Sequence, residues 1–93
     1  MIDKKTVTAL KALRASGPCA EGLLRDFALR KRDRKEISVD SLVRKLRLPR
    51  QKIVSTFRLL EALGVGAFIK GSRGSLSRFR FSVPAYLIGQ AVS

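Results

Sequence analysis

The sequence predicts a mainly α-helical domain with a small β-hairpin, on the basis of two residue patterns and the chain length. Apolar residues recur at helical spacing through residues 38–46 and again through residues 50–63. Two runs of strand character follow, at residues 65–70 and 76–83, joined by the glycine- and serine-rich residues 71–75. A chain of 93 residues is large enough for one hydrophobic core and too small for two, so we expect a single domain.

The stretch at residues 50–63 has the clearest helical pattern in the sequence. Pro49 suits a helix start because its fixed φ costs little there, and Gly64 can take the left-handed conformation that ends a helix. One face is apolar and is expected to be buried, with Ile53, Phe57, Leu60 and Gly64. The opposite face is polar or small, with Gln51, Lys52, Ser55, Arg58 and Ala62. Thr56 and Val54 are expected to pack rather than to face outwards.

The helix predicted at residues 38–46 precedes this one. Ser38 can cap the free amide groups at its start. Its inner face is formed by Val39, Leu42, Val43 and Leu46. The connection at residues 47–49 allows only a tight turn, which Leu48 is expected to fill. Residues 36–37 are expected to form a very short strand that pairs with the hairpin.

Two supporting helices are predicted at the N-terminal end. The first covers residues 3–15, is capped by Asp3, and has an apolar face of Thr6, Val7, Leu10 and Leu13. Residues 16–18 break it, and the second runs from residue 19 to about 32. The apolar side of the second helix contains Ala20, Leu23, Leu24, Phe27 and Ala28. The charged run at residues 30–35 is either a solvated helix end or a contact to phosphates.

The second run of the hairpin has the alternation of a ribbon with one buried face. Its apolar residues Phe79, Phe81 and Val83 alternate with Arg78, Arg80 and Ser82. In the first run, Phe68 points outwards if Ala67 and Ile69 face inwards, and it would then be free to stack on a partner. Arg73 lies between two Gly-Ser pairs, so we expect its side chain to project from the tip of the hairpin.

The net charge of the chain indicates which class of partner it can bind. Twenty Lys and Arg residues against seven Asp and Glu give a net charge of +13, which favours a polyanionic partner. The 45% hydrophobic content argues against a disordered basic tail. Between Arg44 and Arg80 ten residues are basic and Glu61 alone is acidic, so this stretch carries +9. The positive charge is therefore concentrated on the predicted helix pair and hairpin.

The same composition argues against an enzyme. The chain has no histidine, so the usual general base is missing, and its few carboxylates are scattered. The lone Cys19 excludes an intramolecular disulfide and a multi-cysteine zinc site, and we expect neither a metal nor a cofactor. Cys19 is expected to be a buried structural thiol, with a redox-sensing role at a helix start as the alternative.

The order of these elements resembles the winged helix-turn-helix superfamily of DNA-binding domains. The resemblance covers about half the chain and rests on residues 37–49, the apolar face of helix 50–63 and the basic hairpin. The resemblance is at the level of the fold and includes no diagnostic sequence motif. The family usually has a small residue where Val43 stands, glycine at Arg47, and serine or threonine at Pro49. Arg47 would therefore have to adopt a conformation that glycine takes without steric cost.

The resemblance implies an architecture and a set of contacts. The whole chain, residues 1–93, would form one domain. Its two supporting helices would occupy residues 1–35. A short strand, the helix-turn-helix and a two-stranded wing would follow at residues 36–83, and a short C-terminal helix would occupy residues 84–93. Helix 50–63 would read the major groove of double-stranded DNA, and the wing at residues 70–78 would contact the minor groove or the backbone. The candidate DNA-binding residues are Arg44, Lys45, Arg47, Arg50, Gln51, Lys52, Ser55, Arg58, Lys70, Ser72, Arg73, Arg78 and Arg80.

A transcriptional regulator or a nucleoid or silencing factor in the cytoplasm is the expected role. A·T-rich DNA is one candidate target, because a narrow minor groove attracts arginine. An RNA-binding or ribosome-associated protein, a plasmid or phage replication or partition factor, and a protein-interaction module are the alternatives. The apolar residues 84–92 either cover the core of their own chain or form the interface of a homodimer, which we expect. No apolar run reaches the about 20 residues of a membrane span, and no signal-peptide core is present.

Overall fold

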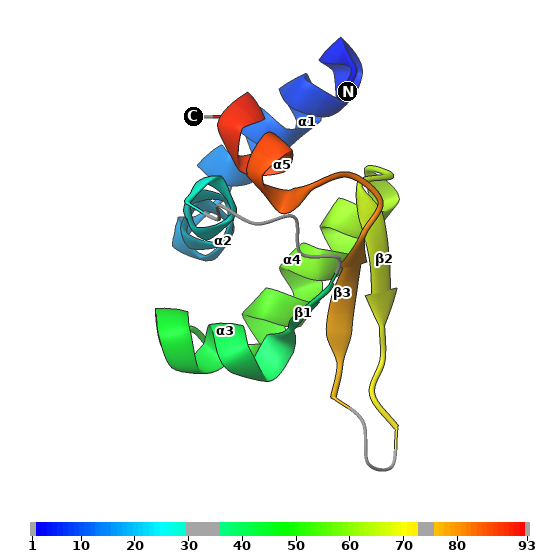
Figure 1. The fold of residues 1–93 in the computed structure, drawn as a ribbon. Helices are drawn as coiled ribbons and strands as arrows, with labels where there is room; N and C mark the ends of the chain where they lie inside the picture. The colour runs from blue at the N-terminus through cyan, green and yellow to red at the C-terminus, as the bar shows by residue number, and fades with distance from the viewer. Residues whose placement is uncertain (1, 30–35, 73–75, 93) are drawn as a thin grey trace.

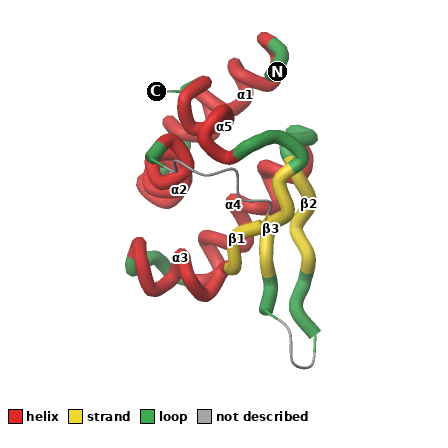
Figure 2. The backbone as a smooth tube through the Cα atoms, in the orientation of Figure 1, coloured by secondary structure: helices red, strands yellow, loops and turns green. Residues whose placement is uncertain are grey.

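Five helices and a three-stranded antiparallel sheet form the fold of the residues that the computed structural model describes, 2–29, 36–72 and 76–92 (Figure 1). In chain order they are α1 (Lys4–Ala15), α2 (Pro18–Ala28), β1 (Glu36–Ser38), α3 (Val39–Leu46), α4 (Arg50–Ala62), β2 (Gly66–Ile69), β3 (Arg78–Phe81) and α5 (Ala85–Ala91). The strand order is β1-β3-β2 (Figure 2). The prediction of a mainly helical domain with a hairpin and a short third strand is confirmed.

Local signals set most of the helix boundaries. The Asp3 carboxylate accepts a hydrogen bond from the Thr6 amide at 2.7 Å, and the Ser38 hydroxyl accepts one from the Ser41 amide at 3.2 Å. Both predicted caps are confirmed. Gly64 has φ 82° and ends α4 as predicted. However, Gly64 is exposed, so it does not continue the buried face of this helix.

The connection between α3 and α4 depends on an unusual residue. Arg47 takes the left-handed conformation, with φ 53° and ψ 41°, and is the only non-glycine residue with positive φ in the described ranges. Its amide donates to the Val43 carbonyl at 2.9 Å, which closes the last turn of α3. Leu48 packs against the core in the turn, as predicted. Arg47 thus occupies a left-handed turn position that glycine would adopt without steric cost.

Three predicted elements are shorter in the structure. The second helix ends at Ala28 rather than near residue 32. Leu29, whose amide donates to the Arg25 and Asp26 carbonyls, is 72% exposed. The charged run at residues 30–35 lies outside the described residues. Both strands are shorter than predicted: β2 covers 66–69 and β3 covers 78–81, although the Ser82 amide still donates to the Val65 carbonyl at 3.0 Å just beyond them.

The core lies where α2, α4 and the sheet meet. The ring of Phe79 stacks on that of Phe57 with centroids 4.9 Å apart, and it meets Phe81 edge-on at 5.1 Å. Phe27 of α2 packs edge-on against Phe81 at 5.2 Å. One aromatic cluster therefore connects the two helices to β3, and this fixes the orientation of α4 relative to the sheet.

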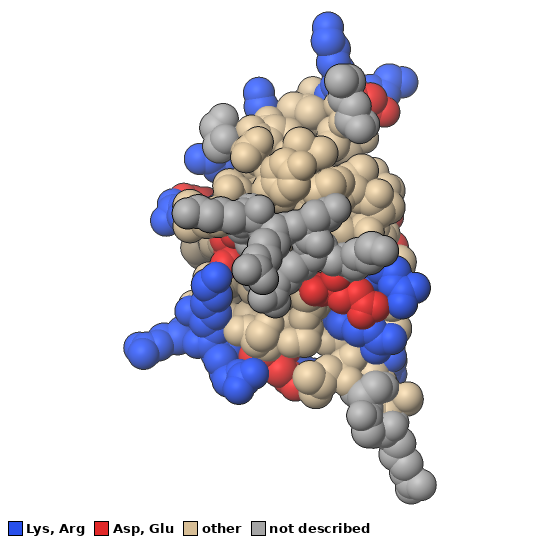
Figure 3. Space-filling view, viewed as in Figure 1, with Lys and Arg blue, Asp and Glu red and all other residues tan. Residues whose placement is uncertain are grey.

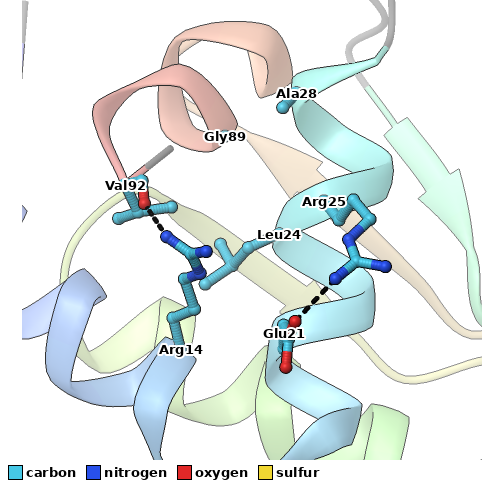
Figure 4. A pocket seen from close by; sticks show the side chains of 7 residues that line it. All are labelled: Arg14, Glu21, Leu24, Arg25, Ala28, Gly89 and Val92. Carbon is cyan, nitrogen blue, oxygen red and sulfur yellow. Dashed lines mark hydrogen bonds and ion pairs between the residues drawn. The ribbon is translucent and has the colours of Figure 1, made fainter.

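The C-terminal segment packs on its own chain. Ala85 and Ile88 are fully buried, and α5 lies against α2 with Gly89 next to Ala28. A cavity of about 170 Å³ remains between α1, α2 and α5, where the Arg14 guanidinium donates to the Val92 carbonyl (Figure 4). Because the apolar face of α5 is used inside the chain, it no longer argues for a homodimer, which stays an untested prediction.

Candidate nucleic-acid interface

The outward face of α4 is polar and solvent-exposed. Ile53, Phe57 and Leu60 are fully buried on its inner face, as predicted. The candidate residues on the other side are exposed, namely Gln51, Lys52, Ser55 and Arg58. Thr56 is buried and its hydroxyl donates to the Lys52 carbonyl at 2.8 Å, so it packs rather than reads a partner. The amphipathic pattern in the sequence therefore assigns the two faces of this helix correctly.

Lys45 is held by an acidic residue that was not among the predicted site residues. Its ammonium group lies 2.6 Å from the carboxylate of Asp26 in α2, whose side chain is only 3% exposed. This ion pair fastens α3 to α2. A buried carboxylate needs such a partner, because an unpaired charge away from water is costly. The position of Asp26 three residues after Leu23, on the apolar side of the helix, was the signal available in the sequence.

The first residue of α4 is also paired. The Arg50 guanidinium donates to the carboxylate of Asp40, which lies in the first turn of α3. The two side chains are 51% and 34% exposed, so the pair is at the surface. Arg50 is thus directed towards the start of α3 across the turn that joins the two helices.

Glu36 in β1 holds the two arginines of β3. Its Oε1 accepts from Arg80 Nη2 at 3.0 Å and from Nε at 3.2 Å, while its Oε2 lies 3.1 Å from Arg78 Nε. The strand register explains this, since Glu36 is directly opposite Arg80 and Ser38 is opposite Arg78. The hydrogen bond from Arg80 lowers the pKa of the Glu36 carboxyl, and the charge of Arg78 lowers it further. Glu36 is therefore ionised at neutral pH.

Phe68 faces the core rather than a partner. Its ring stacks on Phe57 with centroids 6.4 Å apart, and it stands opposite Phe79 in the sheet. Ala67 is exposed, so the alternative in which Ala67 faces inwards and Phe68 points outwards is wrong. The Arg58 guanidinium lies 5.1 Å from the centroid of the Phe68 ring, a cation–π contact at the edge of α4.

The side chains of the remaining candidate cations have no hydrogen bond or ion pair with any described residue. They are Arg44, Arg47, Lys52 and Lys70, and all four are exposed. Ser72 is exposed in the loop after β2. Arg73 lies outside the described residues. The predicted set therefore divides into cations that are free to bind a partner and cations that are already paired.

The surface view shows how the two signs of charge are mixed. In Figure 3, blue basic side chains gather around α3 and along the sheet, and red acidic side chains lie among them. The ion pairs of Asp40 and Glu36 account for this mixture. Glu61 accepts a hydrogen bond from the Phe68 amide at 3.1 Å and thereby ties α4 to β2.

A hollow runs beside the outward face of α4. It has a volume of about 490 Å³ and separates α4 from the turn between α1 and α2, with Lys52 and Ser55 on one side and Pro18 on the other. Leu59 lines it and is 52% exposed. Cys19 is buried at its floor with its sulfur 3.7 Å from the Thr56 hydroxyl, which confirms the prediction of a buried thiol.

Other kinds of site find no support in the part of the chain that the structure describes. Across those residues, no three His, Cys, Asp or Glu side chains gather closely enough to hold a metal ion. None of the described helices combines the length and the apolar character that crossing a membrane requires. Comparisons with protein-family models, with curated proteins and with solved structures each find no match to this chain. The geometry of the interface therefore carries the functional argument alone.

Proposed function

We propose that this chain is a winged helix-turn-helix domain that binds double-stranded DNA, with α3 and α4 as the helix-turn-helix and β2 and β3 as the wing. The observation that carries the proposal is the outward face of α4, which is exposed and contains Gln51, Lys52 and Ser55 without an acidic residue among them. The β2–β3 hairpin lies beside this helix, and the end at which β2 finishes and β3 begins points away from α1 and α5 (Figure 1). A regulator of transcription or a nucleoid factor would use such a surface.

The dimensions of the two partners favour DNA over RNA. An α-helix with its side chains is about 10–12 Å across, which matches the about 12 Å width of the B-DNA major groove. The major groove of A-form RNA is too deep and narrow for a helix. In this proposal the exposed Gln51 and Ser55 contact base edges, and the free cations Arg44, Arg47, Lys52 and Lys70 contact phosphates.

Binding to matched duplexes tests the proposal. Fluorescence anisotropy would be measured with A·T-rich DNA, G·C-rich DNA and double-stranded RNA, each across a series of salt concentrations. We expect DNA to bind more tightly than RNA, and the logarithm of the binding constant to fall linearly with the logarithm of salt concentration. A preference for A·T-rich DNA would support contact of the wing with a narrow minor groove.

A matched pair of variants locates the surface. Lys52→Ala removes a free cation from α4, and Lys11→Ala removes an exposed cation of the same type from α1. We expect Lys52→Ala to reduce the salt slope by about 0.9, the value for one lost phosphate contact on B-DNA, and Lys11→Ala to leave it unchanged. Equal losses for both variants, or equal affinity for RNA and DNA, would contradict a groove-reading helix and favour general phosphate binding.

A further inference from the structure

The hollow beside α4 has the size and the lining of a site for a small organic molecule. Its volume is about 490 Å³, and sites of this kind usually have about 300–1,000 Å³. Four apolar side chains line it, each from a different part of the fold: Leu13 of α1, Pro18 of α2, Leu48 of the α3–α4 turn and Leu59 of α4. Separate elements therefore converge on one concave, partly apolar surface.

The wall that α4 contributes has a cation at one end and a leucine at the other. Lys52, Ser55 and Leu59 follow one another at spacings of three and four residues, so they share one side of the helix. Lys52 and Leu59 are about 10 Å apart along the helix axis. Leu59 is 52% exposed, although the neighbouring Leu60 is fully buried. A single exposed leucine is common on proteins, but here it faces other apolar side chains across a hollow.

The charge of the hollow selects the kind of ligand. Lys52 is the only charged residue among the described residues that line it. Its ammonium group has no hydrogen bond or ion pair with a described residue, whereas Lys45 is held by Asp26. Gln51 and Ser55 line the hollow beside Lys52, are exposed, and can donate further hydrogen bonds. The matching ligand is an anion with an apolar body about two helical turns long.

We propose that the hollow binds a small amphipathic organic anion, whose charged group pairs with Lys52 and whose apolar body lies against Leu59 and the α1–α2 turn. The consequence for DNA rests on the proposed function. Gln51, Lys52 and Ser55 line the hollow and also form the outward face of α4. A ligand in the hollow therefore covers the side chains that a duplex would contact, so ligand and DNA exclude each other, and each lowers the affinity for the other.

The test uses two fluorescent probes that share one ring system. Anilinonaphthalene sulfonate carries a negative charge, and its parent phenylnaphthylamine is uncharged. Leu59→Gln removes the apolar wall, and its control is Leu29→Gln, because Leu29 is 72% exposed at the other end of α2 from Pro18. Lys52→Glu reverses the charge of the hollow, and Lys11→Glu makes the same change on α1. Thermal unfolding confirms that each variant is folded.

The titrations should show one sulfonate probe bound per chain, more tightly than the uncharged probe. Leu59→Gln should weaken both probes by about three- to tenfold, because an apolar contact is lost. Lys52→Glu should weaken the sulfonate by about tenfold and the uncharged probe by less than about twofold, because it turns an attraction into a repulsion. The two control variants should change neither affinity by more than about twofold. Binding of several sulfonates per chain, or equal losses for Lys52→Glu and Lys11→Glu, would overturn the site.

The effect on DNA is measured by duplex titration with and without the sulfonate probe at constant ionic strength. With the probe at ten times its Kd, the apparent Kd of the unmodified protein for a duplex should rise by about elevenfold, as mass action requires for exclusive binding. At the same probe concentration, the apparent Kd of Leu59→Gln should rise by only about two- to fourfold, because the probe binds this variant more weakly.

The failures of the two proposals are distinguishable. If the unmodified protein does not bind duplex DNA, the proposed function is wrong and the antagonism falls with it, while the probe titrations decide the ligand site on their own. If the duplex binds with the same affinity with and without the probe, DNA binding stands and the antagonism is overturned. If the probe weakens duplex binding equally for the unmodified protein and Leu59→Gln, it competes at cations outside the hollow, and the proposed site is overturned.

Discussion

Replacing Gly89 with alanine is expected to destabilise the protein, because α5 lies too close to α2 for a side chain at this position. A Cβ atom on Gly89 would lie 2.2 Å from the backbone nitrogen of Ala28 and 2.5 Å from its Cα. Neither atom can move by a side-chain rotation, so α5 would have to shift away from α2. The opposing effect is the preference of a helix interior for alanine over glycine, about 1 kcal/mol.

The magnitude follows from what the shift disturbs. Overpacking of a well-filled core costs typically about 1–3 kcal/mol. If α5 separates from α2 entirely, the burial of Ile88 is lost, which is worth about 1.5–3 kcal/mol for a side chain of that size. After the gain of about 1 kcal/mol in helix propensity is subtracted from a loss of about 1.5–3 kcal/mol, we expect a net loss of about 0.5–2 kcal/mol. In a domain of this size each kcal/mol corresponds to a decrease in Tm of about 4–8 °C.

The assay is urea unfolding followed by circular dichroism, with the same substitution at Gly22 as the control. A Cβ atom on Gly22 in α2 would lie 3.7 Å from Leu48 Cδ1, an ordinary van der Waals contact. Gly22→Ala should therefore raise stability by about 0.5–1 kcal/mol while Gly89→Ala lowers it. If Gly89→Ala is as stable as the unmodified protein, α5 does not pack on α2 at this distance, and the terminal helix becomes available for a partner again.

Three further predictions concern the core and the ion pairs. Phe57→Ala should lower the free energy of unfolding by about 3–5 kcal/mol in the same urea assay, because the ring is fully buried between α4 and β3; a loss under about 1 kcal/mol would contradict that burial. Lys45→Ala should lower the free energy of unfolding by about 1–3 kcal/mol, because Asp26 loses a partner in a buried site. The neighbouring Arg44→Ala should leave the stability unchanged and weaken DNA binding more than Lys45→Ala does. If Lys45→Ala weakened DNA binding more than Arg44→Ala, Lys45 would be the phosphate contact. Glu36 has a folded pKa below its ordinary value of 4.5, so its pairing stabilises the fold above that value and this contribution is lost as pH falls through the folded pKa. Glu36→Gln should thus be less stable than the unmodified protein at neutral pH and equally stable in strong acid, and a difference that persists in acid would mean that Glu36 acts by packing.

Features that depend on a few neighbouring residues were predictable from the sequence. The caps Asp3 and Ser38 each bond an amide three residues away, and Gly64 ends α4 through its own backbone conformation. The left-handed conformation of Arg47 was predicted from the resemblance to the winged helix-turn-helix superfamily, which usually has glycine at this position of the turn. The two faces of α4 followed from the spacing of Ile53, Phe57 and Leu60, which is fixed by the helix itself.

Features that depend on residues far apart in the chain were not predictable. Glu36 and Arg80 are separated by 44 positions and Asp40 and Arg50 by 10, so only the strand register and the turn bring each pair together. The direction of Phe68 depends on which residue of β3 it opposes, because a shift of one residue would turn every side chain of the strand over. The sequence pattern gave no register, and both orientations of Phe68 were compatible with it.

The charge of the chain and the charge available to a partner are therefore different quantities. Between Arg44 and Arg80 the sequence carries +9, yet four of the ten basic side chains, Lys45, Arg50, Arg78 and Arg80, are already in ion pairs. Arg58 lies over the Phe68 ring, Arg73 is not described, and the side chains of Arg44, Arg47, Lys52 and Lys70 have no hydrogen bond or ion pair with a described residue. A salt slope measured on random-sequence DNA should reflect the free cations, at about 0.9 for each neutralised phosphate. A slope that corresponds to more phosphates than there are free cations would mean that ion-paired arginines leave their carboxylates to contact the DNA, and the ion pairs would then not limit the charge available to a partner.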